Sequence, residues 1–448
     1  MRSPLSTHSC ARSNCLRVVS KTALLLSLLA CGIAAIAAPQ PLSLWQAQQQ
    51  ALARSRQLTA HDLAGTASRE LAVAAGQLPD PVLKVGIDNL PVSGGDRFNS
   101  SNDFMTMRRI GVSQELTRAD KRQWRSARFE REALKSDAQK NVVRAAIQRD
   151  TAIAWLERYY TAQMAALIAV QTDQARHEIA AAEATYRGGR GARTDILAAR
   201  STLLLVADRA SQIDRRLHVA QAMLARWTGE SGESGETSLE AAPDIDHIRL
   251  DPATLDTALA HHPQIAVLNR QEELAQAEAN LARANQRPDW SVEVAFQQRG
   301  PAYSNMVSVG ISVPLQSDRT NRQDRELAAR RAMVEQATAE RDEKFREHVA
   351  ETRTMIVEWQ SGKERVSRYD REVIPLADER THAVLAGYRG GKATLADVLA
   401  ARRNETEVRI QAIELRMETA RLWAQLNFLF PDTGAAPHPA IQTAKDTP

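Results

Sequence analysis

The sequence has 448 residues, of which only 4% are aromatic, and its mean hydropathy is −0.39. This composition suits long helices with much solvated surface better than one thick globular core. The formal net charge is +4, but four of the basic residues lie in the first 21 positions, and beyond them 54 Lys and Arg residues face 54 Asp and Glu residues. Because residues 38–448 are balanced in charge, no nucleic acid partner is expected.

Residues 1–37 have the pattern of a signal peptide for secretion. A basic N-terminal region precedes an apolar run over 22–38, and Ala35-Ile36-Ala37 places small residues at the two positions that a signal peptidase reads. We interpret the segment as cleaved, with an uncleaved anchor as the alternative. Leu28-Leu29-Ala30-Cys31 partly resembles a lipobox, which makes Cys31 a candidate for lipidation.

All three cysteines, Cys10, Cys15 and Cys31, lie in this leader. The exported chain is therefore expected to have no disulfide, no cysteine-ligated metal and no cysteine nucleophile. No later apolar run approaches the roughly 20 residues of a membrane-spanning helix. Any membrane crossing by the exported chain is therefore expected to use β-strands.

The remainder of the chain consists of two similar halves. Each half has a helix, two strands, a long helix, a glycine break and a second helix, and the segment GVSQEL at 111–116 matches GISVPL at 310–315. The predicted organisation is a first repeat at 38–227 (strand hairpin about 82–114, helical hairpin about 119–227), an irregular linker at 228–252, a second repeat at 253–430 (strand hairpin about 290–314, helical hairpin about 320–428) and a disordered tail at 431–448.

The long helical runs exceed the size of a compact domain. Residues 119–186 contain neither Pro nor Gly, and one continuous helix of that length would span roughly 100 Å. The matching run at 320–388 contains Pro375, which should kink the helix or remove a hydrogen bond.

The strands alternate with a period of two. In 290–297, Trp290, Val292, Val294 and Phe296 share one face. Apolar and polar faces of this kind are typical of strands that cross a bilayer, although a soluble, half-buried hairpin has the same local pattern. Four strands cannot close a membrane barrel, whose smallest form has about eight, so a membrane interpretation requires several chains.

One phrase occurs twice, as YRGGRGARTDILAAR from Tyr186 and as YRGGKATLADVLAAR from Tyr388, with nine of fifteen positions identical. Each phrase follows a long helix, so it predicts a tight reversal between two helices. Glycine pairs at 188–189 and 390–391 can supply the positive φ that a reversal needs. Asp195 and Asp397 lie where the next helix starts, and a carboxylate there suits the helix dipole.

With these two phrases, each behind a strand hairpin and a long helix, the chain resembles the TolC family of bacterial outer-membrane efflux proteins over residues of roughly 40–430. The resemblance implies a mainly α fold with a small membrane β-barrel part. Three chains would form an α-barrel of long helical hairpins and a 12-stranded β-barrel with four strands per chain. The segments at 78–92 and 103–116 are most similar to the branch that serves heavy-metal or cation pumps of the RND type.

The same resemblance implies a role and partners. The homotrimer would be a passive exit duct in the outer membrane, reaching into the periplasm, where a membrane-fusion adaptor connects it to an inner-membrane RND pump. Outer-membrane lipids would surround the barrel. A duct for drugs or for type I secretion, and a soluble periplasmic coiled-coil adaptor, are the alternatives.

The two repeated phrases would then form the periplasmic tips, which gate the duct and dock the adaptor. The expected tip residues are Tyr186, Gly188, Gly189, Thr194, Asp195, Tyr388, Gly390, Gly391, Lys392 and Asp397. Asp397 matches a pore-lining acid of the family, but the second acid is replaced by Ala400.

The resemblance also implies a closed-state latch between the two tips. Tyr388 matches a tyrosine that restrains the closed tip, and Thr194-Asp195 matches its partner pair. The arginine that completes the restraint is replaced by Ala393, so a rewired latch through Lys392 is the alternative.

Enzymatic and metal-binding interpretations find little support. GYRGGKA at 387–393 lacks the first glycine and the final Ser or Thr of a phosphate-binding loop. His261 and His262 are adjacent and, on a helix, would not share a face, so no metal site is expected there. No catalytic residue and no cofactor site is expected.

Overall fold

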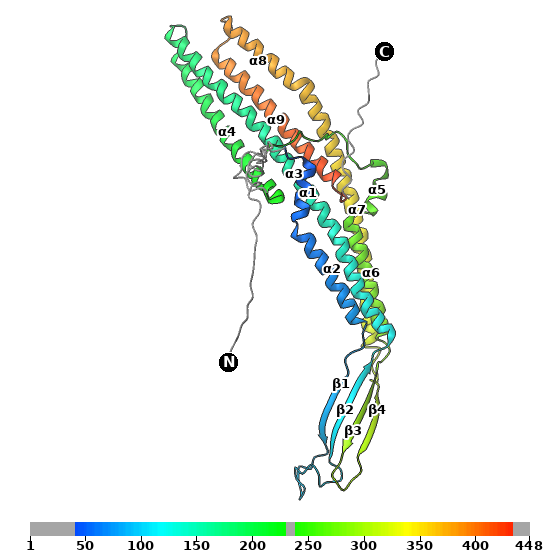
Figure 1. Cartoon of the computed structure of the whole chain (residues 1–448). Helices are drawn as coiled ribbons and strands as arrows, with labels where there is room; N and C mark the ends of the chain where they lie inside the picture. The colour runs from blue at the N-terminus through cyan, green and yellow to red at the C-terminus, as the bar shows by residue number, and fades with distance from the viewer. Residues whose placement is uncertain (1–40, 230–237, 433–448) are drawn as a thin grey trace, which may run out of the picture.

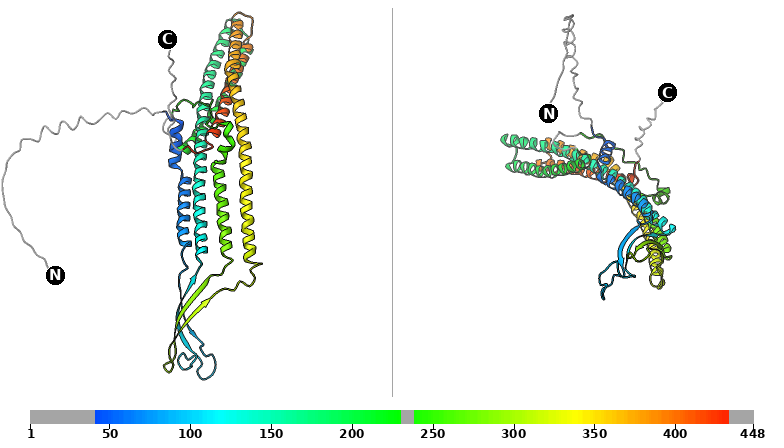
Figure 2. Two further views of the ribbon diagram at one scale, coloured as in Figure 1. Left: turned by 90° about the vertical axis from the view of Figure 1, so that its right-hand side faces the viewer. Right: turned by 60° about the horizontal axis from the view of Figure 1, so that its bottom comes forward.

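The computed structural model describes residues 41–229 and 238–432. The predicted signal peptide, the candidate lipidation site Cys31, part of the linker and most of the C-terminal tail lie outside these ranges. The long helices lie side by side in a curved layer, with a small sheet at one end and two helical tips at the other (Figures 1 and 2).

The described elements follow the chain in two comparable series. The first comprises α1 (Leu44–Arg54), α2 (Arg56–Ala75), β1 (Val82–Asp88), β2 (Met107–Leu116), α3 (Ala119–Arg187) and α4 (Arg193–Thr228). The second comprises η1 (Pro252–Thr254), α5 (Leu255–Ala260), α6 (Pro263–Ala284), β3 (Trp290–Gln298), β4 (Met306–Ser312), α7 (Gln323–Arg368), η2 (Tyr369–Val373), α8 (Ile374–Arg389) and α9 (Leu395–Asn427).

This architecture confirms the expectation of a mainly helical chain with a small antiparallel sheet. Within the described ranges, no helix combines the length and the apolar character needed to cross a membrane.

Helix α3 is continuous over 69 residues, because no Pro or Gly interrupts it. Its counterpart is divided into α7, the π-helix η2 and α8. Pro375 has no N–H, and its ring displaces the carbonyl of the preceding turn. The chain accommodates Pro375 by widening the turn before it: the Ile374 N–H donates to the carbonyl of Tyr369, five residues back. The predicted disturbance at Pro375 is therefore a π segment.

The sheet has the order β1-β2-β3-β4, and every pair is antiparallel. Leu83, Val112, Val294 and Val309 lie opposite one another across all four strands. These four side chains are 48–69% exposed. The sheet thus presents an unpartnered apolar face, and β1 and β4 are its two edges.

Three indoles attach irregular segments to the middle of the helical layer. The Nε1–H groups of Trp155, Trp359 and Trp423 donate to the carbonyls of Leu42, Ile245 and His247, at 3.0, 3.1 and 2.8 Å. The tryptophans come from α3, α7 and α9 and belong to the largest hydrophobic cluster among the described residues. The segments before α1 and before η1 therefore wrap the layer at mid-length.

Candidate functional site at the two hairpin tips

The two repeated phrases lie together at the end of the molecule opposite the sheet (Figure 1). The first joins α3 to α4, and the second joins α8 to α9. Two segments that are about 200 residues apart in sequence thus form one end of the chain.

Both reversals use the same backbone motif, and only the second glycine of each pair is left-handed. Gly189 and Gly391 have φ of +71° and +72°, whereas Gly188 and Gly390 have φ of −80° and −85°. The N–H of the left-handed glycine donates to a carbonyl three residues back, and the next N–H donates to one five residues back. This pair of bonds is a Schellman motif, which satisfies the last carbonyls of the helix.

The two tips differ at the start of the following helix. Thr394 caps α9: its Oγ1 accepts from the Asp397 N–H at 3.2 Å, and Asp397 Oδ2 accepts from the Thr394 N–H at 2.9 Å. At α4 the corresponding residue is Ala192, which has no acceptor side chain, so only the return bond from its N–H to Asp195 Oδ2 forms, at 3.0 Å. The second tip therefore has the more complete capping box.

Both carboxylates expected at the tip are engaged with their own helix. Hydrogen bonds from the Thr394 hydroxyl and N–H hold the pKa of Asp397 below its usual range. Asp397 is thus a fixed negative charge at the tip at neutral pH.

The two tip tyrosines have different surroundings. Tyr388 packs against a small hydrophobic cluster that includes Ala182 of α3 and Leu399 of α9. Tyr186 is 47% exposed. Within the described part of the chain, no hydrogen bond joins Tyr388 to Thr194 or Asp195, so the expected latch is not formed within this chain.

A polar seam joins the two hairpins below the tips. Glu178 of α3 lies 3.2 Å from Nε of Arg402, at side-chain exposures of 9% and 24%. Further from the tip, the Thr406 hydroxyl donates to Gln171 Oε1 at 2.7 Å. Burial raises the pKa of Glu178, and the positive charge of Arg402 opposes this rise.

Sequence reasoning missed this seam, although one signal was available. Arg402 ends the second phrase, as Arg200 ends the first, and Arg200 pairs with Glu183 at 2.8 Å inside its own hairpin. The repeated arginine was therefore a candidate for an ion pair with α3. Its particular acid could not be inferred, because 224 residues separate it from Glu178.

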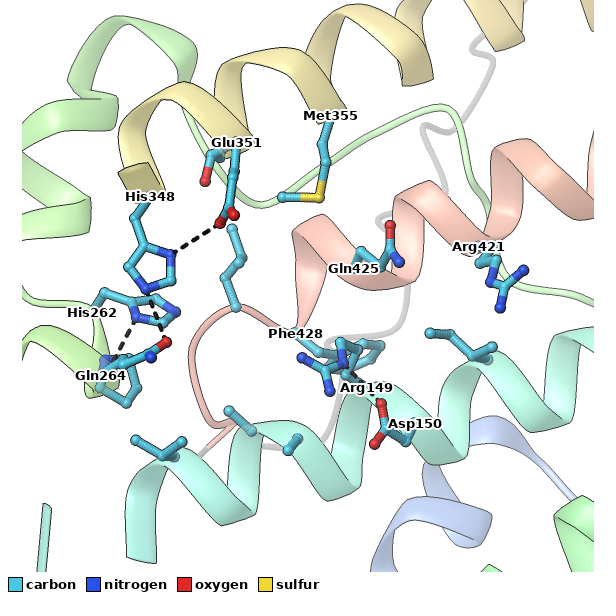
Figure 3. A pocket seen from close by; sticks show the side chains of 17 residues that line it. Arg149, Asp150, His262, Gln264, His348, Glu351, Met355, Arg421, Gln425 and Phe428 are labelled. Atoms are coloured by element: carbon cyan, nitrogen blue, oxygen red, sulfur yellow. Dashed lines mark hydrogen bonds and ion pairs between the residues drawn. The ribbon is translucent and has the colours of Figure 1, made fainter. Parts of the chain in front are cut away.

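A second polar cluster lies at mid-length, where α9 ends and α6 begins (Figure 3). It borders a cavity of about 450 Å³. His262 Nδ1 accepts from the Gln264 N–H at 3.2 Å and so caps α6. The His348 ring lies 4.6 Å from the His262 ring, and His348 Nε2 is 2.9 Å from Gln264 Oε1.

This environment keeps His262 neutral. Burial, followed by the charge of His348, lowers the pKa of His262 to about 4. Within the described residues, no group of three or more His, Cys, Asp or Glu side chains is arranged to hold a metal ion.

Comparisons with known proteins agree with this geometry. Residues 254–430 match the outer membrane efflux protein family. Over 206 residues the chain is 27% identical to the cobalt-zinc-cadmium resistance protein CzcC of Cupriavidus metallidurans. That alignment covers 44% of this chain and 47% of CzcC, so the chain spans about half the length of this curated relative.

Several solved outer-membrane proteins share the fold. The channel CusC has a TM-score of 0.74 at 15% identity, over 87% of this chain and 92% of CusC. The outer-membrane channel OprN has a TM-score of 0.73 at 18% identity, over 87% and 90%. VceC of Vibrio cholerae has a TM-score of 0.70 at 17% identity, over 86% and 95%.

A long helical layer that ends in a small antiparallel sheet is therefore the fold of outer-membrane channel proteins. Residues 254–430 in particular are similar to outer membrane efflux proteins. This similarity agrees with the interpretation of the chain as a non-enzyme. It also agrees with the expected location in the bacterial outer membrane.

Proposed function

We propose that three copies of the chain form an outer-membrane exit duct that passively conducts heavy-metal cations out of the cell. The three sheets form a 12-stranded β-barrel, and the helical layers continue it as a tube into the periplasm. A periplasmic membrane-fusion adaptor connects the tips to an inner-membrane RND pump, which supplies the energy.

The observation that carries this proposal is the two-faced sheet. One face is apolar and open, with Val85 at 73% and Val309 at 69% exposure. The opposite face bears ion pairs, among them Lys84 to Glu293 at 2.5 Å. A soluble sheet would cover its apolar face against a core, whereas lipid is the natural partner of an apolar face whose reverse is polar and charged.

The edges of the sheet support an assembly of several copies. In the described chain, β1 and β4 each pair with a strand on one side only. An open edge cannot persist in a bilayer, because its N–H and C=O groups find no water there. Pairing of β4 with β1 of the next copy closes the barrel, and three copies give the twelve strands that one chain cannot supply.

The tips are proposed to gate the duct and to dock the adaptor. Six tips would surround the entrance of the trimer, and each chain contributes Asp397 as a fixed negative charge. The Tyr388 restraint on Thr194-Asp195 would form only in the assembled, closed tip, with Lys392 as the candidate cation beside it. Unchanged conductance and unchanged cation block in Asp397→Ala trimers would refute the pore role of this acid.

The similarity to a cobalt-zinc-cadmium resistance protein supports metal cations as the substrate. Conduction requires weak, exchangeable contacts instead of a tight metal site. A substrate test is growth of a deletion strain in Co²⁺, Zn²⁺ and Cd²⁺, with and without the gene. If the gene restores growth in organic toxic compounds but not in metals, the substrate is an organic compound and this assignment is wrong.

Disulfide crosslinking tests the assembly directly, because residues 38–448 contain no cysteine. Cysteine at Val85 of β1 is combined with cysteine at Val307, Val309 or Ile311 of β4. We expect at least one pair to crosslink the chains into covalent trimers in outer membranes. Single cysteines are the controls, and monomers throughout the series would contradict the closed barrel.

A further inference from the structure

The polar face of the sheet holds a chain of four charged side chains across three strands. Lys84 Nζ lies 2.5 Å from Glu293 Oε2, and Arg109 Nη1 lies 3.4 Å from Glu293 Oε1. Arg109 Nε lies 3.3 Å from Asp88 Oδ2. Glu293 is thus the acid shared by both cations.

The ion pair between Lys84 and Glu293 depends on a glycine, which has no side chain, in the strand between them. Lys84 is on β1 and Glu293 is on β3, so the lysine must reach across β2. The residue opposite Lys84 on β2 is Gly111, which leaves the path free. A Cβ at this glycine would lie only 2.7 Å from Cβ of Ala295, so Gly111 also permits close packing of β2 on β3.

The charges on this face nearly cancel. Lys84 and Arg109 balance Asp88 and Glu293, and Glu115, on the same face near the helices, adds one negative charge. β4 contributes Ser308, Gly310 and Ser312, none of which is charged. Since the side chains of the ion pairs are about one-third exposed, the pairs contribute little to stability. Their main effect is on the electric field along this face.

We infer that Glu293 and Lys84 determine the charge preference of the exit, with Glu293 neutralising two cations that would otherwise repel a metal cargo. The inference rests on the proposed function, in which this face lines the water-filled barrel. It assigns these residues to substrate selection among ions, a role distinct from gating at the tips.

The test is the reversal potential of purified trimers in a planar bilayer under a KCl gradient. Glu293→Gln should lower the cation-to-anion permeability ratio, and Lys84→Met should raise it, each by about two- to fivefold at low salt. The double variant Lys84→Met/Glu293→Gln should return to the wild-type ratio, because its net charge is unchanged. All shifts should shrink at about 1 M salt, where the Debye length is about 3 Å.

The matched control is Arg108→Met. Arg108 is the neighbour of Arg109 on β2 and lies on the apolar face, so its loss should leave the ratio unchanged. If Lys84→Met does not assemble, Arg109→Met removes the other cation and should shift the ratio in the same direction.

Two failures are distinguishable. If wild-type trimers form no channel, the proposed function fails. If they conduct but Glu293→Gln and Lys84→Met leave the ratio unchanged, or move it in the same direction, the pairs are structural and this inference is wrong.

Discussion

At each tip, one residue reverses the direction of the chain. Gly189 and Gly391 are left-handed, and an added Cβ would meet no atom within 4 Å at either position. The need for glycine is thus one of backbone conformation and not of space. The preceding glycines have ordinary φ values, so they are replaceable.

Alanine substitution should separate the two members of each pair. Gly189→Ala and Gly391→Ala should each destabilise the tip by about 1–2 kcal/mol, because a Cβ disfavours left-handed backbone. Gly188→Ala and Gly390→Ala, the matched controls, should be neutral or slightly stabilising. Amide hydrogen exchange at the tips measures the difference, and equal exchange in all four variants would contradict it.

His262 makes stability depend on pH. Its pKa is about 4 in the folded chain and about 6.5 when unfolded. Below pH 6.5 the unfolded state therefore binds a proton that the folded state does not, and stability falls as the pH falls towards 4. The groups that face the ring are His348 and Lys344 of α7 and the backbone of Leu429.

His262→Asn should keep the helix cap and remove this titration, since asparagine is a good N-cap residue. We expect the free energy of unfolding of the wild-type protein to fall by on the order of 2–3 kcal/mol between pH 7 and pH 4 because of this site, and that of the variant to fall by less. Thermal unfolding measures both. His218→Asn, at an exposed histidine of α4, is the control. The same pH profile in both variants would exclude His262 as the source.

Among the elements, α3 and α9 form most of the contact between the two hairpins. Near mid-length it is hydrophobic, with Trp155 and Trp423 in one cluster. Below the tips it includes the polar pairs Glu178–Arg402 and Gln171–Thr406. At the tips it is hydrophobic again, where Ala182 and Leu399 belong to one cluster. Polar contacts can exchange partners more readily than a packed core can, so we expect the contact between the hairpins to rearrange most easily at these polar pairs.

Removing one partner of Glu178–Arg402 should destabilise the seam by about 2 kcal/mol or more, because a buried charge is left alone. In Arg402→Leu the cost should increase from pH 5 to pH 8, since Glu178, whose pKa is raised, must give up its proton with no cation beside it. The double variant Glu178→Leu/Arg402→Leu should recover most of the loss.

The first hairpin provides a control ion pair. Glu183 and Arg200 occupy a similar place in the first hairpin but are 38% and 59% exposed, so Arg200→Leu should cost at most about 1 kcal/mol. Thermal unfolding of the purified variants compares the two sites. Equal losses at both would show that burial does not distinguish them.

On the scale of the whole molecule, the two faces of the sheet determine its surroundings. Val309 lies on the apolar face and Ser308 on the polar face of the same strand. The same substitution at these neighbouring positions therefore tests which face meets lipid.

Val309→Lys should reduce the yield of trimer in the outer membrane, because a lysine near the middle of a bilayer costs about 2–4 kcal/mol on the lipid face of a barrel. Ser308→Lys should assemble nearly as well as wild type. Quantitative immunoblots of outer-membrane fractions measure both. A loss confined to Ser308→Lys would reverse the assignment of the faces.

The sequence by itself determined the features that depend on local pattern. The absence of Pro and Gly predicted a helix as long as α3. The alternation of apolar and polar residues predicted the strands, and the repeated phrase predicted two helical reversals. These properties depend on a residue and its near neighbours, so they can be predicted from the sequence without knowledge of the fold.

Only the tertiary structure decided which residues meet. It showed which glycine of each pair is left-handed, that Glu178 faces Arg402, that Lys84 reaches Glu293 across Gly111, and that His262 caps a helix beside His348. Each of the three side-chain contacts joins segments that are tens to hundreds of residues apart, and their geometry depends on the register between helices or strands. The handedness of a single glycine depends on the hydrogen bonds that end its helix. Local periodicity carries no information about such registers.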